Sequence, residues 1–406
     1  MKTKNIVVIT YWSFGDALIQ TYTLPYLRII RKILPHGSQI NLITLEKWAL
    51  SKEEKARITE ELQRDDIVWL PRPYHAFGLL AVIKWLKNLI YLSFFIRKNK
   101  IDFIHCWCTP AGAIGYVLSI ITGKKLILDS YEPHAEAMVE NGTWKKGSLP
   151  FHLLFRLERW QSHKAFAVIG TTQGMRDYAR MKYDVHFDTF FVKPACVDVS
   201  LFSAANVKRQ ELVEEFGFTD KIVCVYAGKL GGIYLDQEVF DFLSAAYSVW
   251  QNNFRVLLLT SHSAQEIETF CKRSLLEPSI VTSLSVPHSQ VANYIGLGDF
   301  AITPVKPVST KRYCTPIKNG EYWALGLPVI IPKNISDDSD IIEQNTIGYV
   351  LPSLDRESYM SAVHFLDSFL KTNRKEHFEK IRSIAFKYRS FAIAENVYKA
   401  IYTEKV

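Results

Sequence analysis

The sequence contains little that would suit it to an oxidising compartment. Its 406 residues include six cysteines, and their spacing matches neither a disulfide framework nor a zinc site. Cys106 and Cys108 form an isolated pair separated by one residue. We therefore expect ordinary buried thiols and a protein that works in a reducing, cytoplasmic environment.

A long apolar run without charge is also absent. The most apolar stretch, residues 76–96, carries Lys84 and Lys87 in its middle. Each lysine would cost roughly 2.5–3.5 kcal/mol at a bilayer centre, so we expect no spanning helix. No signal peptide is expected either, because Asp16 follows the first apolar residues before any cleavage-like site.

Two interpretations of the stretch 76–96 remain open. It is either a buried amphipathic helix or a helix that lies in a membrane interface. The second interpretation rests on aromatic residues beside a basic flank, namely Trp85, Tyr91, Phe94 and Phe95 followed by Arg97, Lys98 and Lys100.

Two sequence signatures of cofactor and metal enzymes are missing. No Gly-x-Gly-x-x-Gly motif with a downstream acid occurs, which argues against a dinucleotide enzyme. No Asp-x-Asp pair lies where a metal-dependent transferase would need one. Asp337, Asp338 and Asp340 follow a predicted strand in a polar segment, and we expect them to be solvated.

The excess of positive over negative charge lies in the first half of the chain. The net charge is +8, and residues 1–198 hold 27 Lys and Arg against 18 Asp and Glu, which leaves 22 against 23 for the remainder. Such asymmetry suggests an anionic surface as a partner. No nucleic-acid motif with interleaved aromatic residues is present, so membrane lipids are preferred over nucleic acid.

Length and patterning predict two α/β domains. A chain of 406 residues exceeds what one hydrophobic core usually serves. Apolar segments alternate with helical patterns in both halves, which is typical of doubly wound parallel sheets. The predicted strands are 5–10, 40–44, 67–70, 101–105, 125–130, 165–170 and 190–193, then 221–228, 255–260, 280–286, 299–305 and 329–331. Ligands of such sheets bind at the carboxyl ends of the strands.

The best-defined motif is the segment 314–332. Thr315 is a good N-cap, and Pro316 suits the first helical position because its missing N–H costs nothing there. Gly326 suits a left-handed C-terminal cap, and Pro328 prevents the helix from continuing. The apolar residues 329–331 then predict a buried parallel strand.

The first turn of this predicted helix is a candidate anion site. Its unpaired N–H groups and the positive end of its dipole favour an anion, and Lys318 adds a full charge. Glu321, three residues later, shares the same helical face. A cation followed by a carboxylate in this arrangement could hold a diphosphate and ribose hydroxyls together.

Two further groups of polar residues follow predicted strands. In the second half, strand 221–228 leads into Gly228, Lys229, Gly231 and Gly232. In the first half, the strand 125–130 leads into a segment with three ionisable groups, Asp129, Glu132 and His134. Histidine titrates near neutrality and can donate to a hydroxyl or a leaving oxygen. Pro133 is expected at the first position of the next helix, and His105 is expected to be structural.

The run TPIKNGEYWALGLPVI, residues 315–330, resembles the donor-site motif of family 4 glycosyltransferases. The resemblance implies the GT-B fold, two Rossmann-like domains that face each other across a cleft. Its implied boundaries are an acceptor domain over 1–198 with a last helix over 385–406 that returns to it, and a donor domain over 199–384.

The resemblance implies a role for each candidate residue. The donor would contact Gly15, Gly228, Lys229, Gly231, Gly232, Thr315, Pro316, Lys318 and Glu321. The acceptor side would comprise Asp16, Glu132 and His134. The residues closest to the chemistry would be His134, Lys229 and Glu321.

By the same resemblance the reaction is transfer of a sugar from a nucleotide-sugar with retention of configuration. A UDP-sugar is favoured as donor and a GDP-sugar is the alternative. The acceptor would be a glycan or a lipid-linked molecule, with the enzyme at the inner face of the cell membrane. No metal or other cofactor is expected, because Lys229, Lys318 and the helix start would stabilise the diphosphate leaving group.

Two alternatives stay open at this point. One is a nucleotide-sugar epimerase or a phosphorylase on the same fold. The other is a non-catalytic partner subunit, because Tyr313 stands where many family members have a glutamate and the family's second lysine near Lys229 is missing.

Overall fold

The computed structural model describes residues 3–75 and 79–403. The start of the apolar run predicted over 76–96, residues 76–78, lies outside these ranges. The chain divides into two compact units, Met1–Lys193 with Ala392–Val406, and Pro194–Phe391. The predicted boundaries were 198/199 and 384/385, a few residues from these.

The first unit is built on a parallel sheet. Within the described residues it has seven strands in the order β3-β2-β1-β4-β5-β6-β7, and each neighbouring pair is parallel. The order reverses between β1 and β4, which makes that point the topological switch. The strands are β1 (Ile6–Ile9), β2 (Ile40–Glu46), β3 (Ile67–Pro73), β4 (Phe103–Trp107), β5 (Lys125–Tyr131), β6 (Ala167–Gly170) and β7 (Phe190–Val192).

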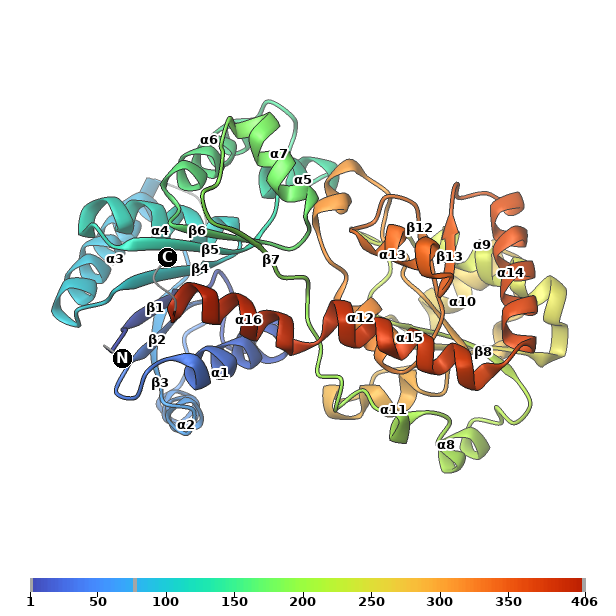
Figure 1. The fold of residues 1–406 in the computed structure, drawn as a ribbon. Helices are drawn as coiled ribbons and strands as arrows, with labels where there is room; N and C mark the ends of the chain where they lie inside the picture. The colour runs from blue at the N-terminus through green and yellow to red at the C-terminus, as the bar shows by residue number, and fades with distance from the viewer. Residues whose placement is uncertain (1–2, 76–78, 404–406) are drawn as a thin grey trace. The chain divides into compact units, whose positions relative to one another are not determined.

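Helices cover both faces of this sheet (Figure 1). The connections over one face use α1 and α2, and those over the other use α3, α4 and α6, as right-handed crossovers require. The helices are α1 (Leu24–Ile33), α2 (Lys52–Gln63), α3 (Leu79–Lys98), α4 (Thr109–Thr122), α5 (His134–Glu140), α6 (Leu149–Lys164), α7 (Gly174–Tyr183) and α16 (Phe391–Tyr402), with a π-helix at Ile19–Thr23.

The second unit repeats the plan with a smaller sheet. Its described strands run in the order β10-β9-β8-β11-β12-β13, again with parallel neighbours, and the switch lies between β8 and β11. They are β8 (Ile222–Ala227), β9 (Phe254–Leu259), β10 (Val281–Leu284), β11 (Phe300–Ile302), β12 (Val329–Pro332) and β13 (Gly348–Leu351). Two hydrophobic cores fill its two faces.

One core of the second unit lies beneath α11, α12 and α15, and the other beneath α9, α10 and α14. The helices are α8 (Gln210–Glu215), α9 (Gln237–Trp250), α10 (Ala264–Arg273), α11 (Val291–Ile295), α12 (Ile317–Ala324), α13 (Asp338–Asn345), α14 (Arg356–Lys371) and α15 (Arg374–Arg389). Short 3-10 turns occur at Ala204–Asn206, Gln251–Asn253, Pro278–Ile280, His288–Gln290 and Ser309–Tyr313.

The α/β fold class and the two parallel sheets predicted from the sequence are confirmed. The predicted last helix over 385–406 is wrong in its extent, because the helix breaks at Ser390, between α15 and α16. Ser390 is extended (φ −71°, ψ 152°) and pairs as an isolated parallel bridge with Val197. The two helices therefore belong to different units.

The cysteines behave as the sequence predicts. All six are free, and five are buried while Cys314 is partly exposed. Burial raises the pKa of the Cys108 thiol to about 12. None of the helices in the described ranges is both long and apolar enough to cross a membrane.

Candidate functional site

A glycine loop at the switch point of the second sheet meets the start of α12. Strand β8 ends at Ala227, and Gly228 adopts a φ of +154°. A Cβ atom at Gly228 would lie 2.7 Å from Lys318 Cε and 3.1 Å from Lys318 Nζ. The side chain of Lys318 therefore passes close to the Gly228 backbone, and the φ of +154° is one that residues with a side chain rarely adopt.

The rest of this loop is fastened on both sides. Gly231 and Gly232 take positive φ values of +77° and +64°, which turns the chain back on itself. The Leu235 N–H then donates to the Pro304 carbonyl over 2.7 Å, and Tyr234 forms an antiparallel bridge with Val305. The loop after β8 is thus held against the segment after β11.

Lys229 is exposed and follows Gly228 directly. Its carbonyl accepts a hydrogen bond from the Tyr226 hydroxyl over 2.6 Å. The next N–H, of Leu230, donates to His262 Nε2 over 3.1 Å. His262 in turn lies 3.4 Å from Glu266. Sequence reasoning missed His262, because no motif linked it to a loop more than 30 residues away.

Helix α12 begins one residue later than predicted. Pro316 is its N-cap and Ile317 its first residue, so Thr315 is not the cap and Pro316 is not the first helical position. The predicted end is confirmed, because Gly326 has a φ of +71° just after the C-cap Leu325. Thr315 and Pro316 still immediately precede the open N–H groups of the helix.

Lys318 and Glu321 lie on one face of α12, as the sequence predicts. The ammonium of Lys318 also contacts the Tyr234 ring, 5.2 Å from its centroid. The Glu321 side chain is buried, and burial raises its pKa while the charge of Lys318 opposes the rise. A buried carboxylate beside a cation is a strong hydrogen-bond acceptor for hydroxyl groups.

A buried polar network fixes α12 from behind. The Asn319 side chain contacts Thr303 and donates to Asp338 Oδ2 over 2.5 Å. The other Asp338 oxygen accepts from Arg389. Asp338 is fully buried, so the prediction that it is solvated is wrong, whereas Asp340 is exposed as predicted.

The segment before α12 is ordered, although its sequence is polar. It contains the 3-10 turn Ser309–Tyr313, and Thr310 and Lys311 are buried. The carbonyl of Lys311 accepts from the Ser336 N–H over 2.9 Å. The approach to the helix start is therefore held in place.

In the first unit, His134 and Glu132 are brought together. His134 begins α5, and its Nδ1 lies 3.7 Å from Glu132 Oε1 with both side chains partly exposed. Pro133 is the N-cap of α5 and not its first residue, which corrects the prediction. The His134 N–H donates to the Glu132 carbonyl over 2.9 Å.

Glu158 on α6 holds this segment and was missed from the sequence. Its Oε1 accepts from the Ala135 N–H and its Oε2 from the Tyr183 hydroxyl, each over 2.8 Å. Burial raises its pKa to about 7, although these hydrogen bonds oppose the rise. The signal was an acid on the apolar face of a helix, a position that usually requires partners.

Asp129 does not share the exposed loop with Glu132 and His134. It is fully buried, 3.2 Å from Lys193 Nζ, and it accepts from Tyr398 over 2.8 Å and contacts His105 over 3.1 Å. Burial acts to raise its pKa, but Lys193 and the hydrogen bonds outweigh this and lower the pKa to about 2. His105 is structural, as predicted.

Gly15 and Asp16 lie in the loop after β1. Gly15 is exposed, and a Cβ atom there would meet no atom within 4 Å. The Asp16 carboxylate accepts from the Leu18 N–H over 2.9 Å, so it also caps the helical segment that follows. Nothing in the backbone requires glycine at position 15.

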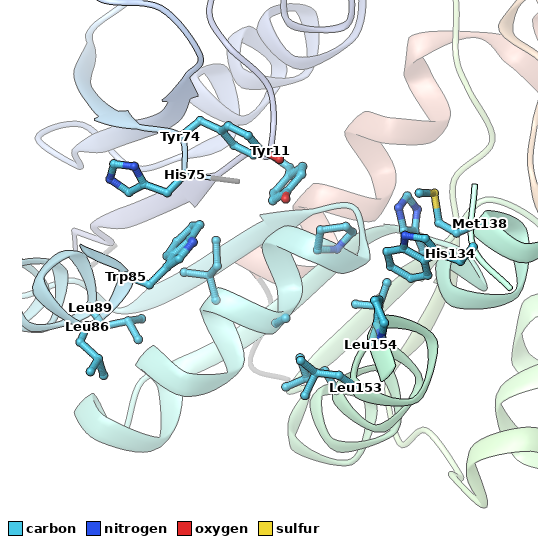
Figure 2. A pocket seen from close by; sticks show the side chains of 16 residues that line it. Tyr11, Tyr74, His75, Trp85, Leu86, Leu89, His134, Met138, Leu153 and Leu154 are labelled. Carbon is cyan, nitrogen blue, oxygen red and sulfur yellow. The ribbon is translucent and has the colours of Figure 1, made fainter. Parts of the chain in front are cut away.

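An apolar pocket of about 590 Å³ opens beside His134 in the first unit (Figure 2). Its walls come from α3, α4, α5, α6 and the loops after β1 and β3. In the described part of the chain, no three His, Cys, Asp or Glu residues are grouped so that they could hold a metal ion.

Comparison with solved structures shows which known fold this is. A glycosyltransferase from Rickettsia africae matches with a TM-score of 0.69 at 16% identity, over 100% of each chain. HepE from Anabaena, in complex with UDP, matches with a TM-score of 0.71 at 13% identity, over 99% of this chain and 100% of that one. The chain has the GT-B fold.

A third solved structure is that of a protein from Listeria monocytogenes named "putative UDP-N-acetylglucosamine 2-epimerase". It matches with a TM-score of 0.62 at 13% identity, over 98% of this chain and 96% of that one. Residues 306–391, which contain α12, match the family model "Glucosyltransferase 3-like, C-terminal domain". No curated protein matches the sequence. The GT-B fold and this domain together support a transferase enzyme.

Proposed function

We propose that this protein is a retaining glycosyltransferase that moves a sugar from a UDP-sugar to a glycan or lipid-linked acceptor in polysaccharide or glycoconjugate biosynthesis. The observation that carries the proposal is the passage of Lys318 over Gly228, which joins the two sequence motifs at one sheet edge. Structures of HepE hold UDP and UDP-glucose, which supports a UDP-sugar.

The donor diphosphate binds at the start of α12 in this proposal. Lys318 and Lys229 flank Gly228, and the first N–H groups of α12 add the positive end of a helix dipole. Negative charge develops on the diphosphate as the bond to the sugar breaks. Fixed cations and N–H groups stabilise that charge most effectively in the transition state, and no metal ion is invoked.

Glu321 accepts hydrogen bonds from the ribose hydroxyls in this proposal. Glu321 follows Lys318 by about one helical turn on the same face, next to the proposed diphosphate position. His134 and Glu132 act on the acceptor side of the first unit, where His134 donates to a sugar hydroxyl. Asp16, in the loop after β1, completes the acceptor side of the first unit in this proposal.

Thermal unfolding with a nucleotide panel tests the donor site. UDP, GDP, ADP and CMP are added in chelator, and UDP at 100 times its Kd is expected to add about 2.7 kcal/mol to the stability. Lys229→Ala, Lys318→Ala and Glu321→Ala should each lose this shift. Lys333→Ala, which removes an exposed lysine of the same unit, should keep it.

Equal stabilisation of the wild type and all three site variants would show that the site is elsewhere. The absence of any nucleotide effect would instead favour a non-catalytic subunit, the alternative motivated by Tyr313. Retention is tested separately by NMR of the product, where a sugar with inverted anomeric configuration would contradict the proposal.

The shared fold of the Listeria protein makes a nucleotide-sugar epimerase the second candidate. The two activities differ in their need for an acceptor. A transferase releases UDP in proportion to acceptor added, whereas an epimerase converts UDP-N-acetylglucosamine into its 2-epimer with no acceptor present. One NMR assay can follow both the release of UDP and the formation of the 2-epimer.

A further inference from the structure

One face of the first unit exposes many large apolar side chains. Helices α3, α4 and α6 pack side by side over this face of the sheet (Figure 1). Large exposed apolar areas on a folded protein usually mark an interaction site. The exposed side chains are Ile83, Leu86, Ile90, Tyr91 and Phe94 on α3, Ile120 and Ile121 on α4, and Leu149, Leu153 and Trp160 on α6.

The charges on these three helices have one sign. Neither α3 nor α4 contains an Asp or Glu, and the single acid of α6, Glu158, is fully buried. Seven basic side chains are exposed on α3 and α6, namely Lys84, Lys87, Arg97, Lys98, Arg156, Arg159 and Lys164. We call this surface of α3, α4 and α6 the basic-apolar face. Among the side chains that the structure describes, all the exposed Lys, Arg, Asp and Glu residues on these three helices are Lys or Arg.

The 590 Å³ pocket lies within the basic-apolar face. Figure 2 shows Trp85, Leu86 and Leu89 of α3 on one side and Leu153 and Leu154 of α6 on the other. Between them, α4 contributes Ala113 and Ile114. Leu86 and Leu153 are both pocket-lining and exposed, so the pocket is continuous with the outer apolar surface.

The pocket has a polar end. The lining residues with polar tips, Tyr11, Tyr74, His75 and His134, come from segments after β1, β3 and β5. These segments lie at the carboxyl edge of a parallel sheet, where ligands bind. The pocket therefore runs from the helix surface, which is apolar, to the candidate acceptor residue His134.

We propose that this pocket holds the hydrocarbon chain of a lipid-linked acceptor, with the acceptor's polar end at His134 and the basic-apolar face on an anionic lipid surface. The inference rests on the proposed function and specifies its acceptor class. A glycan alone would leave its hydroxyl groups against an apolar wall, which costs free energy. A hydrocarbon chain gains by leaving water for the same wall.

The positive charge of the basic-apolar face favours an anionic lipid surface over a second copy of the protein as its partner. Two copies that met through the basic-apolar face would bring like charges together, which opposes association. An anionic lipid surface complements both properties, because apolar side chains enter the interface while lysines and arginines contact the headgroups.

Soluble amphiphiles test the proposed hydrocarbon-chain site without requiring catalytic turnover. Dodecyl phosphate, below its critical micelle concentration, is compared with butyl phosphate by isothermal titration calorimetry. Both carry the same headgroup, so a difference in affinity reports on the chain. Each buried methylene is worth about fourfold in affinity, and we expect dodecyl phosphate to bind at least tenfold more tightly.

Two pairs of variants locate the site. Ala113→Trp fills the pocket from α4, whereas Ile120→Trp adds the same group to an exposed position of that helix outside it. Leu153→Glu places a charge in the pocket mouth. Leu149→Glu places the same charge at an exposed position of α6 outside the pocket. The first member of each pair should lose at least tenfold in dodecyl phosphate affinity, and the second should keep it.

Several results would overturn the proposal. These are equal affinity for the two phosphates, unchanged binding by both pocket variants, or binding to phosphatidylglycerol vesicles without binding of the single-chain amphiphile. The last would mean that the face contacts a bilayer while the pocket holds no chain. A dimer in solution with no amphiphile binding would assign the face to a second copy.

The UDP-dependent thermal shift separates this proposal from the proposed function. The pocket variants should keep the shift, because the donor residues lie in the second unit. If UDP gives no thermal shift with the wild type while dodecyl phosphate still binds, the proposed function is contradicted and the hydrocarbon-chain site is supported.

Discussion

Gly228 is the residue on which the proposed donor site depends most directly, because Lys318 passes close to its backbone. In Gly228→Ala, the new methyl group would overlap Lys318 Cε and force the ammonium away. We expect at least a tenfold loss of UDP affinity, measured by calorimetry. Gly217→Ala is the control, since Gly217 also has a positive φ (+63°) but open space around it. That variant should lose about 1 kcal/mol of stability and no affinity.

Glu158 gives the first unit a pH dependence of known sign. Burial raises its folded pKa to about 7 from an ordinary 4.5, so the folded state binds the proton more tightly than the unfolded chain. Stability from this group is therefore greatest below pH 4.5 and falls as pH rises through 7, by roughly 3 kcal/mol in all. Glu158→Gln should flatten the slope of Tm against pH between 5 and 7.5.

The control for this slope is Glu357→Gln, which removes an exposed carboxylate of the second unit. Its pH profile should match the wild type. A wild-type Tm that rises from pH 5 to 7 relative to the Tm of Glu158→Gln would contradict the sign. Loss of acceptor turnover in parallel with the slope would tie the Glu158 proton to the His134 segment, which it holds through the Ala135 N–H.

At the scale of the element, α12 is positioned by a network that its own sequence does not reveal. Asp338 links Asn319 of α12 to Arg389 of α15 in a fully buried site. Asp338→Asn puts an amide N–H against one of two donors, so we expect a cost of about 3–5 kcal/mol in urea unfolding of the second unit. Asp340→Asn, on the exposed side of α13, should cost less than about 0.5 kcal/mol.

Equal unfolding midpoints for the two aspartate variants would show that the network does not stabilise the unit. A second readout separates stability from site geometry. If the network positions α12, Asp338→Asn should weaken UDP binding even in the absence of urea, where the unit is fully folded.

Elements with local boundary signals were predictable from the sequence, and those without were not. Gly326 and Pro328 end α12 through their own backbone constraints, so the end of the helix is found where predicted. The break at Ser390 has no such signal, because a bridge to Val197 imposes it. Strand β13, four residues of which two are partly exposed, was not predicted.

The same distinction applies to the site. Lys318 and Glu321 were predictable because their spacing within one helix is itself the signal. The burial of Asp338 depends on Arg389, 51 residues later, and the support of Leu230 depends on His262. Contacts of this kind follow from the folded topology, which no single segment encodes.

At the scale of the whole molecule, the first unit is completed by residues that follow the entire second unit in the chain. From α16, Tyr398 donates to buried Asp129 over 2.8 Å, and the Tyr402 hydroxyl lies 2.6 Å from His105 Nδ1. These contacts reach β4 and β5, the strands that precede the pocket and the His134 segment. The stability of the first unit therefore depends on α16, which lies near the C-terminal end of the sequence.

The double variant Tyr398→Phe with Tyr402→Phe tests this dependence in the full chain. Each substitution keeps the ring and removes a hydroxyl that contacts a buried group, so we expect a combined loss of roughly 2–4 kcal/mol. Hydrogen-exchange mass spectrometry should show faster exchange in β4 and β5 and unchanged exchange in β8 and β11. The UDP-dependent thermal shift should remain, because the donor residues belong to the other unit. Equally faster exchange in both sheets would mean that the two units unfold together and that α16 stabilises the whole chain.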